Sequence, residues 1–196
     1  MRLLSQFVLF CYRWFIRLSS KSFSLLISRA FAGFGKSTVL MLPLRLSGED
    51  RIRVGDGVFL GPDCWLQALP DGENRAIAIS IGSGTSMSGM CVISAVRGVF
   101  LEESVLLARN VYISDHIHKY SEIDVPILAQ GLDKIKPVLI KRGAWLGQNV
   151  VVCPGVTIGV GAVVGANSVV NQDIPDYAVA VGSPAKVVKR IGLTAC

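Results

Sequence analysis

The chain has 196 residues and a mass of 21.0 kDa, which is enough for one ordinary domain. Hydrophobic residues make up 51% of it and charged residues only 17%, a composition that excludes an intrinsically disordered protein. The net charge of +6 comes from residues 1–45, which carry seven basic and no acidic side chains, whereas residues 46–196, with 13 basic and 14 acidic ones, carry −1. This distribution argues against a general nucleic-acid-binding surface.

Residues 2–29 are predicted to form a basic amphipathic helix. On a helical wheel one side holds Arg2, Gln6, Arg13, Arg17, Ser20, Lys21 and Ser24. The rest of the wheel includes Leu4, Phe7, Val8, Cys11, Phe15 and Leu18. Because Arg13 and Arg17 interrupt the apolar run and no small-residue cleavage site follows, we expect neither a spanning helix nor a signal peptide.

Two interpretations of this helix remain open. It can lie in the plane of a membrane, with its basic side chains attracted to anionic headgroups. It can also pack its wide apolar side on the rest of the protein or on a partner subunit. Under the first interpretation, the protein is cytoplasmic and bound peripherally to the inner face of the membrane.

A glycine-containing segment, GFGKST at residues 33–38, follows the helix. A phosphate-binding loop would need glycine in place of Ala30 and a buried strand before it, and the sequence provides neither. We therefore predict a hinge here, and an N-terminal segment that comprises residues 1–45.

A six-residue period governs the rest of the chain. From residue 140 the hexads begin with aliphatic residues at Ile140, Leu146, Val152, Ile158, Val164 and Val170. Small or β-branched residues follow four positions later, at Ala144, Val150, Val156, Ala162, Ser168 and Ile174. Earlier hexads begin at Val54, Leu60, Leu66, Ile81, Met87, Ile93, Leu101, Leu107 and Ile113. Helices repeat at 3.6 residues and sandwich strands at 2, so this period predicts a parallel β-helix over residues 46–191, followed by a tail at 192–196.

The period breaks between Ile113 and Ile140, which are 27 residues apart. We expect an excursion from the β-helix there, a loop of about residues 116–136. At its base stand the only histidines of the chain, His116 and His118, which strand alternation directs to the outer face together. A neutral imidazole there can act as a general base, and the alternative is a surface turn without a function.

The segment ISDHIHKY, the hexads from GAWLGQNVV onward and the final GSPAKVVKR resemble the left-handed β-helix of the hexapeptide-repeat acyltransferases. They are most similar to the branch that O-acetylates bacterial cell-surface polysaccharide sugars, which is related to the galactoside and maltose acetyltransferases. The resemblance implies a homotrimer with acyl-CoA bound between subunits, and it places the catalytic base at His116, with His118 as the fallback. The N-terminal helix is then a candidate cap for one end of the β-helix.

The resemblance also implies contacts for acetyl-CoA, without any metal. The candidate cofactor-binding residues are Trp145, Gly147, Gln148, Ala166, Gln172, Lys186 and Lys189. The alternative for the lysines is a solvated basic tail. Ser88, nearest to an acceptor-site asparagine of the galactoside branch, and Asp115 are the candidate substrate-binding residues. Asp115 is also a candidate for orienting an imidazole, but adjacent strand residues are expected to point to opposite faces.

The five cysteines, Cys11, Cys64, Cys91, Cys153 and Cys196, form no CxxC pair, which indicates reduced thiols in a cytoplasmic protein. Cys64 and Cys91 fall on small inward positions, and Cys153 falls beside a corner. We expect all three to fill space, because the sequence places no base beside them for a covalent thioester mechanism.

These observations predict an acetyl-CoA-dependent O-acetyltransferase that acts on a sugar hydroxyl of a cell-surface polysaccharide or its precursor, by direct attack on the thioester. One alternative is an N-acetyltransferase of a nucleotide-linked amino sugar, and another is a non-catalytic scaffold. A zinc carbonic anhydrase would need three histidines at each site, more than the two of this chain. If the helix touches a membrane, a lipid-linked glycan is the favoured acceptor.

Overall fold

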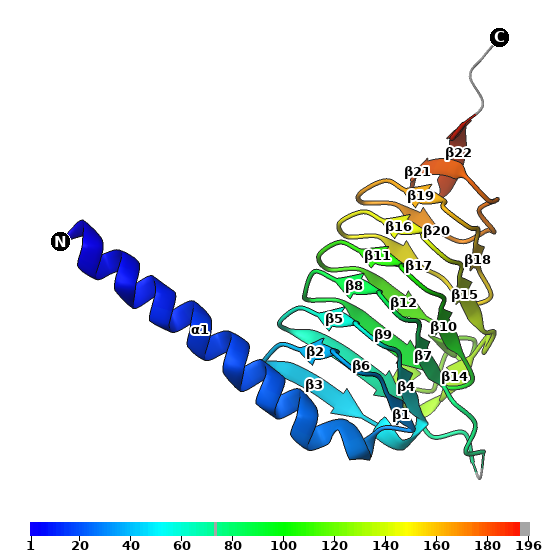
Figure 1. Cartoon of the computed structure of the whole chain (residues 1–196). Helices are drawn as coiled ribbons and strands as arrows, with labels where there is room; N and C mark the ends of the chain where they lie inside the picture. Colours follow the sequence, from blue (N-terminus) through cyan, green and yellow to red (C-terminus); the bar gives the residue numbers. More distant parts are fainter. Residues whose placement is uncertain (73, 193–196) are drawn as a thin grey trace.

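The computed structural model describes residues 1–72 and 74–192. A long helix, α1 (Arg2–Ile27), leads into a stack of short-stranded coils, and β22 lies at the far end of the stack (Figure 1). The strands of successive coils form three parallel sheets, so the fold is a three-sided parallel β-helix. The 3-10 helices are η1 (Ser28–Ala30), η2 (Glu49–Arg51) and η3 (Ile127–Ala129).

Each coil contributes one strand to each of the three sheets, which we call A, B and C. Sheet A contains β1 (Gly33–Phe34), β4 (Ile52–Val54), β7 (Ile79–Ile81), β10 (Val99–Leu101), β15 (Val138–Ile140) and β18 (Thr157–Ile158). Sheet B contains β2 (Val39–Leu40), β5 (Phe59–Leu60), β8 (Ser86–Met87), β11 (Leu106–Leu107), β16 (Trp145–Leu146), β19 (Val163–Val164), β21 (Ala178–Gly182) and β22 (Ala185–Arg190). Sheet C contains β3 (Leu44–Ser47), β6 (Cys64–Ala68), β9 (Val92–Ala95), β12 (Tyr112–Ser114), β17 (Val151–Val152) and β20 (Val169–Val170).

The interior of the β-helix is the aliphatic column that the hexads predict. All fifteen hexad-leading residues from Val54 to Val170 are at most 3% exposed. The small residues four positions later are buried as well, with Ile174 the most exposed of them at 4%. Since each buried aliphatic side chain contributes roughly 1.5–3 kcal/mol, this column is the main source of stability.

The corners between sheets B and C stack with little space. Asn110, Asn149 and Asn167 all have positive φ and are joined by side-chain hydrogen bonds of 2.9 and 2.8 Å, which form a ladder along this corner. A Cβ atom on Gly147 would lie 2.7 Å from the backbone nitrogen of Ala166, so this position requires glycine.

The β-helix begins earlier than the sequence predicts. Parallel pairing starts at Gly33, because β1, β2 and β3 pair with β4, β5 and β6. Residues 33–38 therefore form part of the first coil rather than a hinge, and the boundary at residue 46 is corrected to residue 33. Its corner is held by the Lys36 N–H, which donates to Asp56 Oδ1 at 2.6 Å. The six-residue period extends into this coil, where Phe34, Leu40 and Leu46 pair with Val54, Leu60 and Leu66.

Helix α1 contacts the first coil through serines. Ser20 and Ser24 are its buried residues, and Ser24 Oγ accepts the Leu40 N–H of the edge strand β2 at 2.8 Å. The same hydroxyl donates to Ser20 O at 2.6 Å. The helix thus caps the first coil, as expected. The interpretation in which its apolar side packs on its own β-helix is wrong, because that side remains exposed.

None of the helices described is long and apolar enough to cross a bilayer. Between β12 and β15 the chain forms β13 (Ile117–His118), η3 and β14 (Leu132–Asp133), with β13 and β14 paired antiparallel to each other. The Lys136 N–H donates to Asp115 O at 2.8 Å where the chain returns. At the far end β22 turns back antiparallel to β21. Cys196 and the rest of the predicted tail beyond Gly192 lie outside the described residues.

Candidate functional site

Asp115 lies directly after β12, where the strand ends, and is fully buried. Its carboxylate accepts the backbone N–H groups of Val96, Arg97 and Gly98, with the shortest contacts at 2.7 Å. Asp115 Oδ1 also lies 2.8 Å from His116 Nδ1. A turn of the previous coil therefore holds the carboxylate, and the carboxylate holds the imidazole.

The expectation that Asp115 would point away from the neighbouring imidazole is wrong. Strand alternation applies within regular strand, and residue 115 is a bend after β12. At this bend the two adjacent side chains meet. Because Asp115 has no exposed surface, its predicted place among the substrate-binding residues is also corrected: it orients His116.

Opposing effects act on the pKa of Asp115. Burial on its own would raise the pKa, but the hydrogen bonds from His116, Gly98, Val96 and Arg97 favour the charged form and bring the pKa below its usual value. Asp115 is therefore ionised at neutral pH. An ionised carboxylate can only accept, so His116 Nδ1 donates in this contact, which in the neutral ring leaves the lone pair on Nε2.

The imidazole of His116 lies at the meeting point of two adjoining surface hollows of about 330 Å³ each. The first, which we call the Trp65 hollow, is lined by Trp65, Gln67, Leu69, Val92, Ser94, Tyr112, His116, His118 and Leu132. The second, the Cys153 hollow, is lined by Tyr112, Ser114, His116, Ile117, His118, Val151, Val152, Cys153 and Pro154. Both histidines and Tyr112 border both hollows. His116 itself is 9% exposed, whereas His118 is exposed.

Several residues of the Trp65 hollow were not predicted from the sequence. Ser94 Oγ donates to Gln67 Oε1 at 3.2 Å, and the Arg45 guanidinium carbon lies 4.6 Å from the centre of the Trp65 ring. These residues lie on the outer face of sheet C, one to three coils before the histidines. Alignment of the outward hexad positions could have found them, because stacked coils place equivalent positions side by side.

Cys153 lines the same hollow as His116 and His118. The expectation that no base lies near Cys153 is therefore wrong. Burial raises the pKa of the Cys153 thiol, however, which favours the neutral, weakly nucleophilic form. Cys64 and Cys91 have no exposed surface and fill the core as expected.

The candidate cofactor-binding residues lie on another part of the chain. Trp145 is 48% exposed on the outer face of sheet B. Gly147, Gln148 and Ala166 meet at the corner after it, where the Asn167 N–H donates to Gln148 O at 2.8 Å. Farther along, Lys186 Nζ donates to Gln172 Oε1 at 3.4 Å, and Lys189 is exposed on the same strand, β22.

Within one chain these residues do not meet the histidines. None of the seven lines either histidine hollow, because sheet B and the end of β12 are on different sides of the β-helix. Ser88 is exposed at the corner after β8 and lines neither hollow, so its predicted place in the acceptor site has no support in a single chain.

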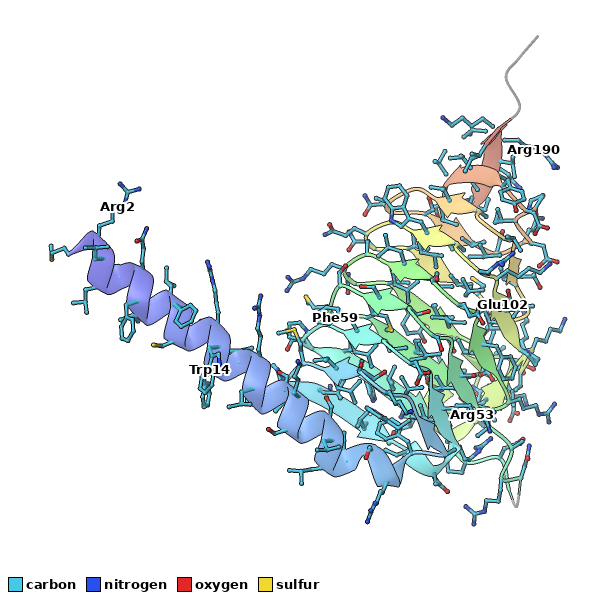
Figure 2. The ribbon with its side chains drawn as sticks, viewed as in Figure 1. Arg2, Trp14, Arg53, Phe59, Glu102 and Arg190 are labelled. Carbon is cyan, nitrogen blue, oxygen red and sulfur yellow. The ribbon has the colours of Figure 1, made fainter. Side chains whose placement is uncertain are left out.

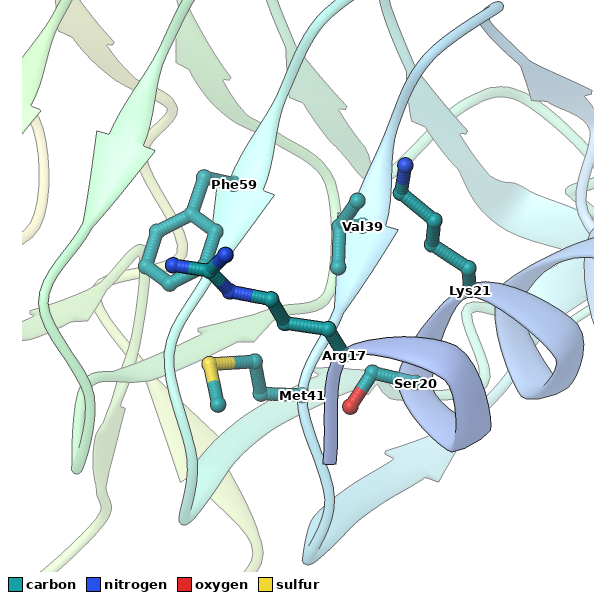
Figure 3. Close-up of a pocket in the computed structure, with 6 residues that line it drawn as sticks. All are labelled: Arg17, Ser20, Lys21, Val39, Met41 and Phe59. Carbon is teal, nitrogen blue, oxygen red and sulfur yellow. The ribbon is translucent and has the colours of Figure 1, made fainter. Parts of the chain in front are cut away.

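Another hollow, of about 500 Å³, lies between α1 and the first strands of sheet B. Its wall is formed by Val39, Met41 and Phe59, and Arg17 and Lys21 extend over it from the helix (Figure 3). Its polar groups are the hydroxyl of Ser20, the Lys21 amine and the Arg17 guanidinium. The described residues contain no group of three His, Cys, Asp or Glu side chains that could hold a metal ion.

The turn that holds Asp115 is itself held by a buried arginine. Arg51 is 4% exposed, and its guanidinium donates to the backbone oxygens of Leu69, Ala76 and Val96 at 2.5, 2.9 and 2.8 Å. Among the described residues Arg51 forms no ion pair with a carboxylate. Val96 therefore accepts from Arg51 with its carbonyl and donates to Asp115 with its N–H.

Replacing Arg51 with methionine should lower the free energy of unfolding by about 3 kcal/mol, because three backbone carbonyls, one of them in a fully buried hydrogen bond, lose a charged donor. For a chain of this size that corresponds to a fall in Tm of about 6–12 °C. Thermal unfolding followed by circular dichroism measures it. Arg53→Met is the matched control, since Arg53 is exposed on the next strand and should cost less than about 0.5 kcal/mol. Equal Tm values for the two variants would contradict the role of Arg51.

Comparison with known proteins supplies a family. Residues 137–172 match the family model described as bacterial transferase hexapeptide (six repeats). WbbJ of Escherichia coli, named as a candidate lipopolysaccharide biosynthesis O-acetyl transferase, is 31% identical over 171 residues, which cover 84% of each protein. A candidate acetyltransferase of Mycobacterium tuberculosis is 46% identical over 150 residues, and the chain spans only 50% of that relative's length.

Solved structures share the architecture. AntD, an N-acyltransferase from Bacillus cereus in complex with dTDP and 3-hydroxybutyryl-CoA, matches with a TM-score of 0.71 and 18% identity over 85% of this chain and 87% of that one. The hexapeptide-repeat acetyltransferase VCA0836 from Vibrio cholerae matches with a TM-score of 0.61 and 24% identity over 87% of this chain and 80% of that one. At these identities the likeness is one of fold.

Proposed function

The chain belongs to the bacterial hexapeptide-repeat transferases, and from this membership and the geometry around His116 we propose that it is an acetyl-CoA-dependent O-acetyltransferase. Its acceptor is a sugar hydroxyl of a cell-surface polysaccharide or of a lipid-linked precursor. The observation that best supports this proposal is the buried contact between Asp115 Oδ1 and His116 Nδ1 at 2.8 Å. His116 borders two hollows on the outer face of the β-helix. The similarity to WbbJ supports the choice of an oxygen acceptor.

In this mechanism His116 Nε2 removes the proton from the sugar hydroxyl as its oxygen attacks the carbonyl carbon of the acetyl thioester. The tetrahedral intermediate collapses, the carbon–sulfur bond breaks, and His116 returns the proton to the departing CoA thiolate. Asp115 stabilises the imidazolium while it carries the proton and keeps the proton of Nδ1 in place. The products are the acetyl ester of the sugar and free CoA, which carries the proton that left the sugar hydroxyl.

The separation of the two groups of residues supports an active site between subunits of a homotrimer. The outer face of sheet B offers an apolar strip, with Trp145 paired to Val163 and Val163 to Val179, that ends at the lysines of β22. Such a strip suits the pantetheine arm of CoA, with Lys186 and Lys189 at its phosphates. We propose that this strip on one subunit faces the histidine hollows of the next.

Replacing Lys186 and Lys189 with alanine should raise the KM for acetyl-CoA about tenfold or more for the pair and leave kcat nearly unchanged, because the phosphates are bound equally in the ground and transition states. Initial-rate measurements over a range of acetyl-CoA concentrations test this. Lys36→Ala, at the opposite end of the stack, is the control and should leave both constants unchanged. A fall in kcat with unchanged KM would contradict the assignment.

The proposed function is tested by a thiol-release assay of the purified protein with acetyl-CoA. The acceptor panel comprises hexoses, nucleotide sugars, lipid-linked oligosaccharides and amino sugars, and the products are analysed by mass spectrometry. Acetylation of a hydroxyl supports the proposal. If no acceptor gives thiol release and calorimetry detects no binding of acetyl-CoA, the protein is a non-catalytic scaffold and the proposal fails.

A second candidate is an N-acyltransferase of a nucleotide-linked amino sugar. Its support is the similarity of fold to AntD, a mutant of which has been solved with dTDP-4-amino-4,6-dideoxyglucose and coenzyme A. The same imidazole would remove a proton from the attacking amine. Treatment of the product with mild base separates the two candidates, because an acetyl ester is cleaved under conditions in which an amide survives.

A further inference from the structure

Helix α1 exposes an apolar surface that the rest of the chain does not cover. Twelve large apolar side chains of the helix are each at least 49% exposed. They are Leu3, Leu4, Phe7, Val8, Leu9, Phe10, Tyr12, Trp14, Phe15, Leu18, Leu25 and Leu26. An apolar surface of this extent marks an interaction site.

The packing of α1 fixes which side faces outward. The side that contacts the β-helix is marked by Ser20 and Ser24, and on a helical wheel Leu4, Cys11 and Phe15 lie on the opposite side. The basic residues follow the serine side. Figure 2 shows Arg2 and Trp14 projecting from opposite sides of the helix. The helix therefore has its polar side toward the β-helix and its apolar side away from it.

The charge of the helix indicates which kind of partner its apolar side contacts. Helix α1 carries Arg2, Arg13, Arg17 and Lys21 and no acidic residue. Anionic headgroups complement these charges, whereas a second copy of the helix offers no acidic side chain to pair with them.

We propose that α1 docks the protein on an anionic phospholipid surface. The helix lies in the plane of the membrane, with Phe7, Trp14 and Phe15 among the acyl chains and the basic side chains at the headgroups. Because the contact with the first coil is made by the serine side, docking requires no rearrangement of the β-helix. The first coil is then the part of the β-helix nearest to the membrane.

Co-sedimentation of the full chain with phosphatidylcholine vesicles that contain phosphatidylglycerol tests this proposal, with pure phosphatidylcholine vesicles for comparison. We expect tighter binding to the anionic vesicles, weakened by salt. The triple variant Phe7→Ser, Trp14→Ser, Phe15→Ser should reduce the partition coefficient at least about a hundredfold. Arg2→Glu with Arg13→Glu should reduce it about tenfold or more on anionic vesicles.

The matched control is Tyr120→Ser, Ile123→Ser, Leu128→Ser, three residues between β13 and β14 that are at least as exposed as the three of the helix. It should bind vesicles like the unmodified chain. Circular dichroism and sedimentation velocity check that all variants keep their fold. The proposal is overturned if the unmodified chain does not bind anionic vesicles, or if the control variant loses as much binding. Loss of an oligomer in the α1 variant, without vesicle binding by the unmodified chain, would identify a second copy as the occupant. The assay involves no turnover, so its failure leaves the proposed acetyl transfer standing.

Discussion

His116→Ala should reduce kcat/KM for acetyl transfer by about 10²–10⁴-fold, the range typical for loss of a general base. The His116 side chain lines both hollows, and nothing on β12 can replace it once Asp115 is committed to three backbone N–H groups. Steady-state kinetics of the thiol-release assay measure the effect. Binding of acetyl-CoA should remain, because its candidate contacts lie on sheet B.

Two single substitutions serve as controls for this result. His118→Ala should change the rate less than about fivefold, since His118 is exposed and holds no carboxylate partner among the described residues. Cys153→Ala should also remain active if the acetyl group passes directly to the sugar. Full activity of His116→Ala would remove His116 from the mechanism. A large loss in Cys153→Ala would instead indicate an acetyl-cysteine intermediate.

Asp115→Asn should reduce kcat about a thousandfold with little change in the KM for acetyl-CoA. An amide cannot accept from every donor now on the carboxylate, and its NH2 group would face an N–H group of residues 96–98 or the ring of His116. The imidazole would lose its orientation and its preferred tautomer. Asp124→Asn, an exposed carboxylate, is the control and should retain full activity.

The same substitution should lower the free energy of unfolding by about 3 kcal/mol at neutral pH. Because the pKa of folded Asp115 lies below its ordinary value of 3.8, the ionised carboxylate stabilises the fold fully above that value. The contribution is lost as pH falls through the lower pKa of the folded state. Urea unfolding should therefore show a constant difference between the two proteins above about pH 5 that shrinks in acid. A difference independent of pH down to full protonation would contradict the charged role.

The β-helix could be predicted because its sequence pattern repeats every six residues. Leu146, Val152 and Ile158 recur at six-residue intervals, and each points into the same interior column. A period that persists over many coils survives local irregularities. The first coil follows the same period, because Phe34, Leu40 and Leu46 pair with the hexad leaders Val54, Leu60 and Leu66, so the sequence pattern could also have shown where the β-helix begins.

The site could be predicted only in part, because it depends on a departure from repetition. The break in period located His116 and His118, but the contact between Asp115 and His116 arises from a bend that alternation does not anticipate. The role of Arg51 could not be predicted, because its partners are backbone carbonyls up to 45 residues away along the sequence. Such partners leave no recognisable pattern in the sequence. Likewise, the sequence did not indicate that Ser24 contacts the β-helix, which only its hydrogen bond with the Leu40 N–H shows.

The coils are stacked at a regular spacing, so the position of a strand in a sheet gives its distance along the stack. Along sheet C the strand β12, which leads to His116, is the third neighbour after the edge strand β3. At about 4.8 Å per strand, this places the imidazole roughly 14 Å along the stack from the first coil. With α1 at a bilayer surface, the acceptor sugar of a membrane-bound glycan would have to reach that height. Coil number would then set the distance from the lipid at which acetylation occurs.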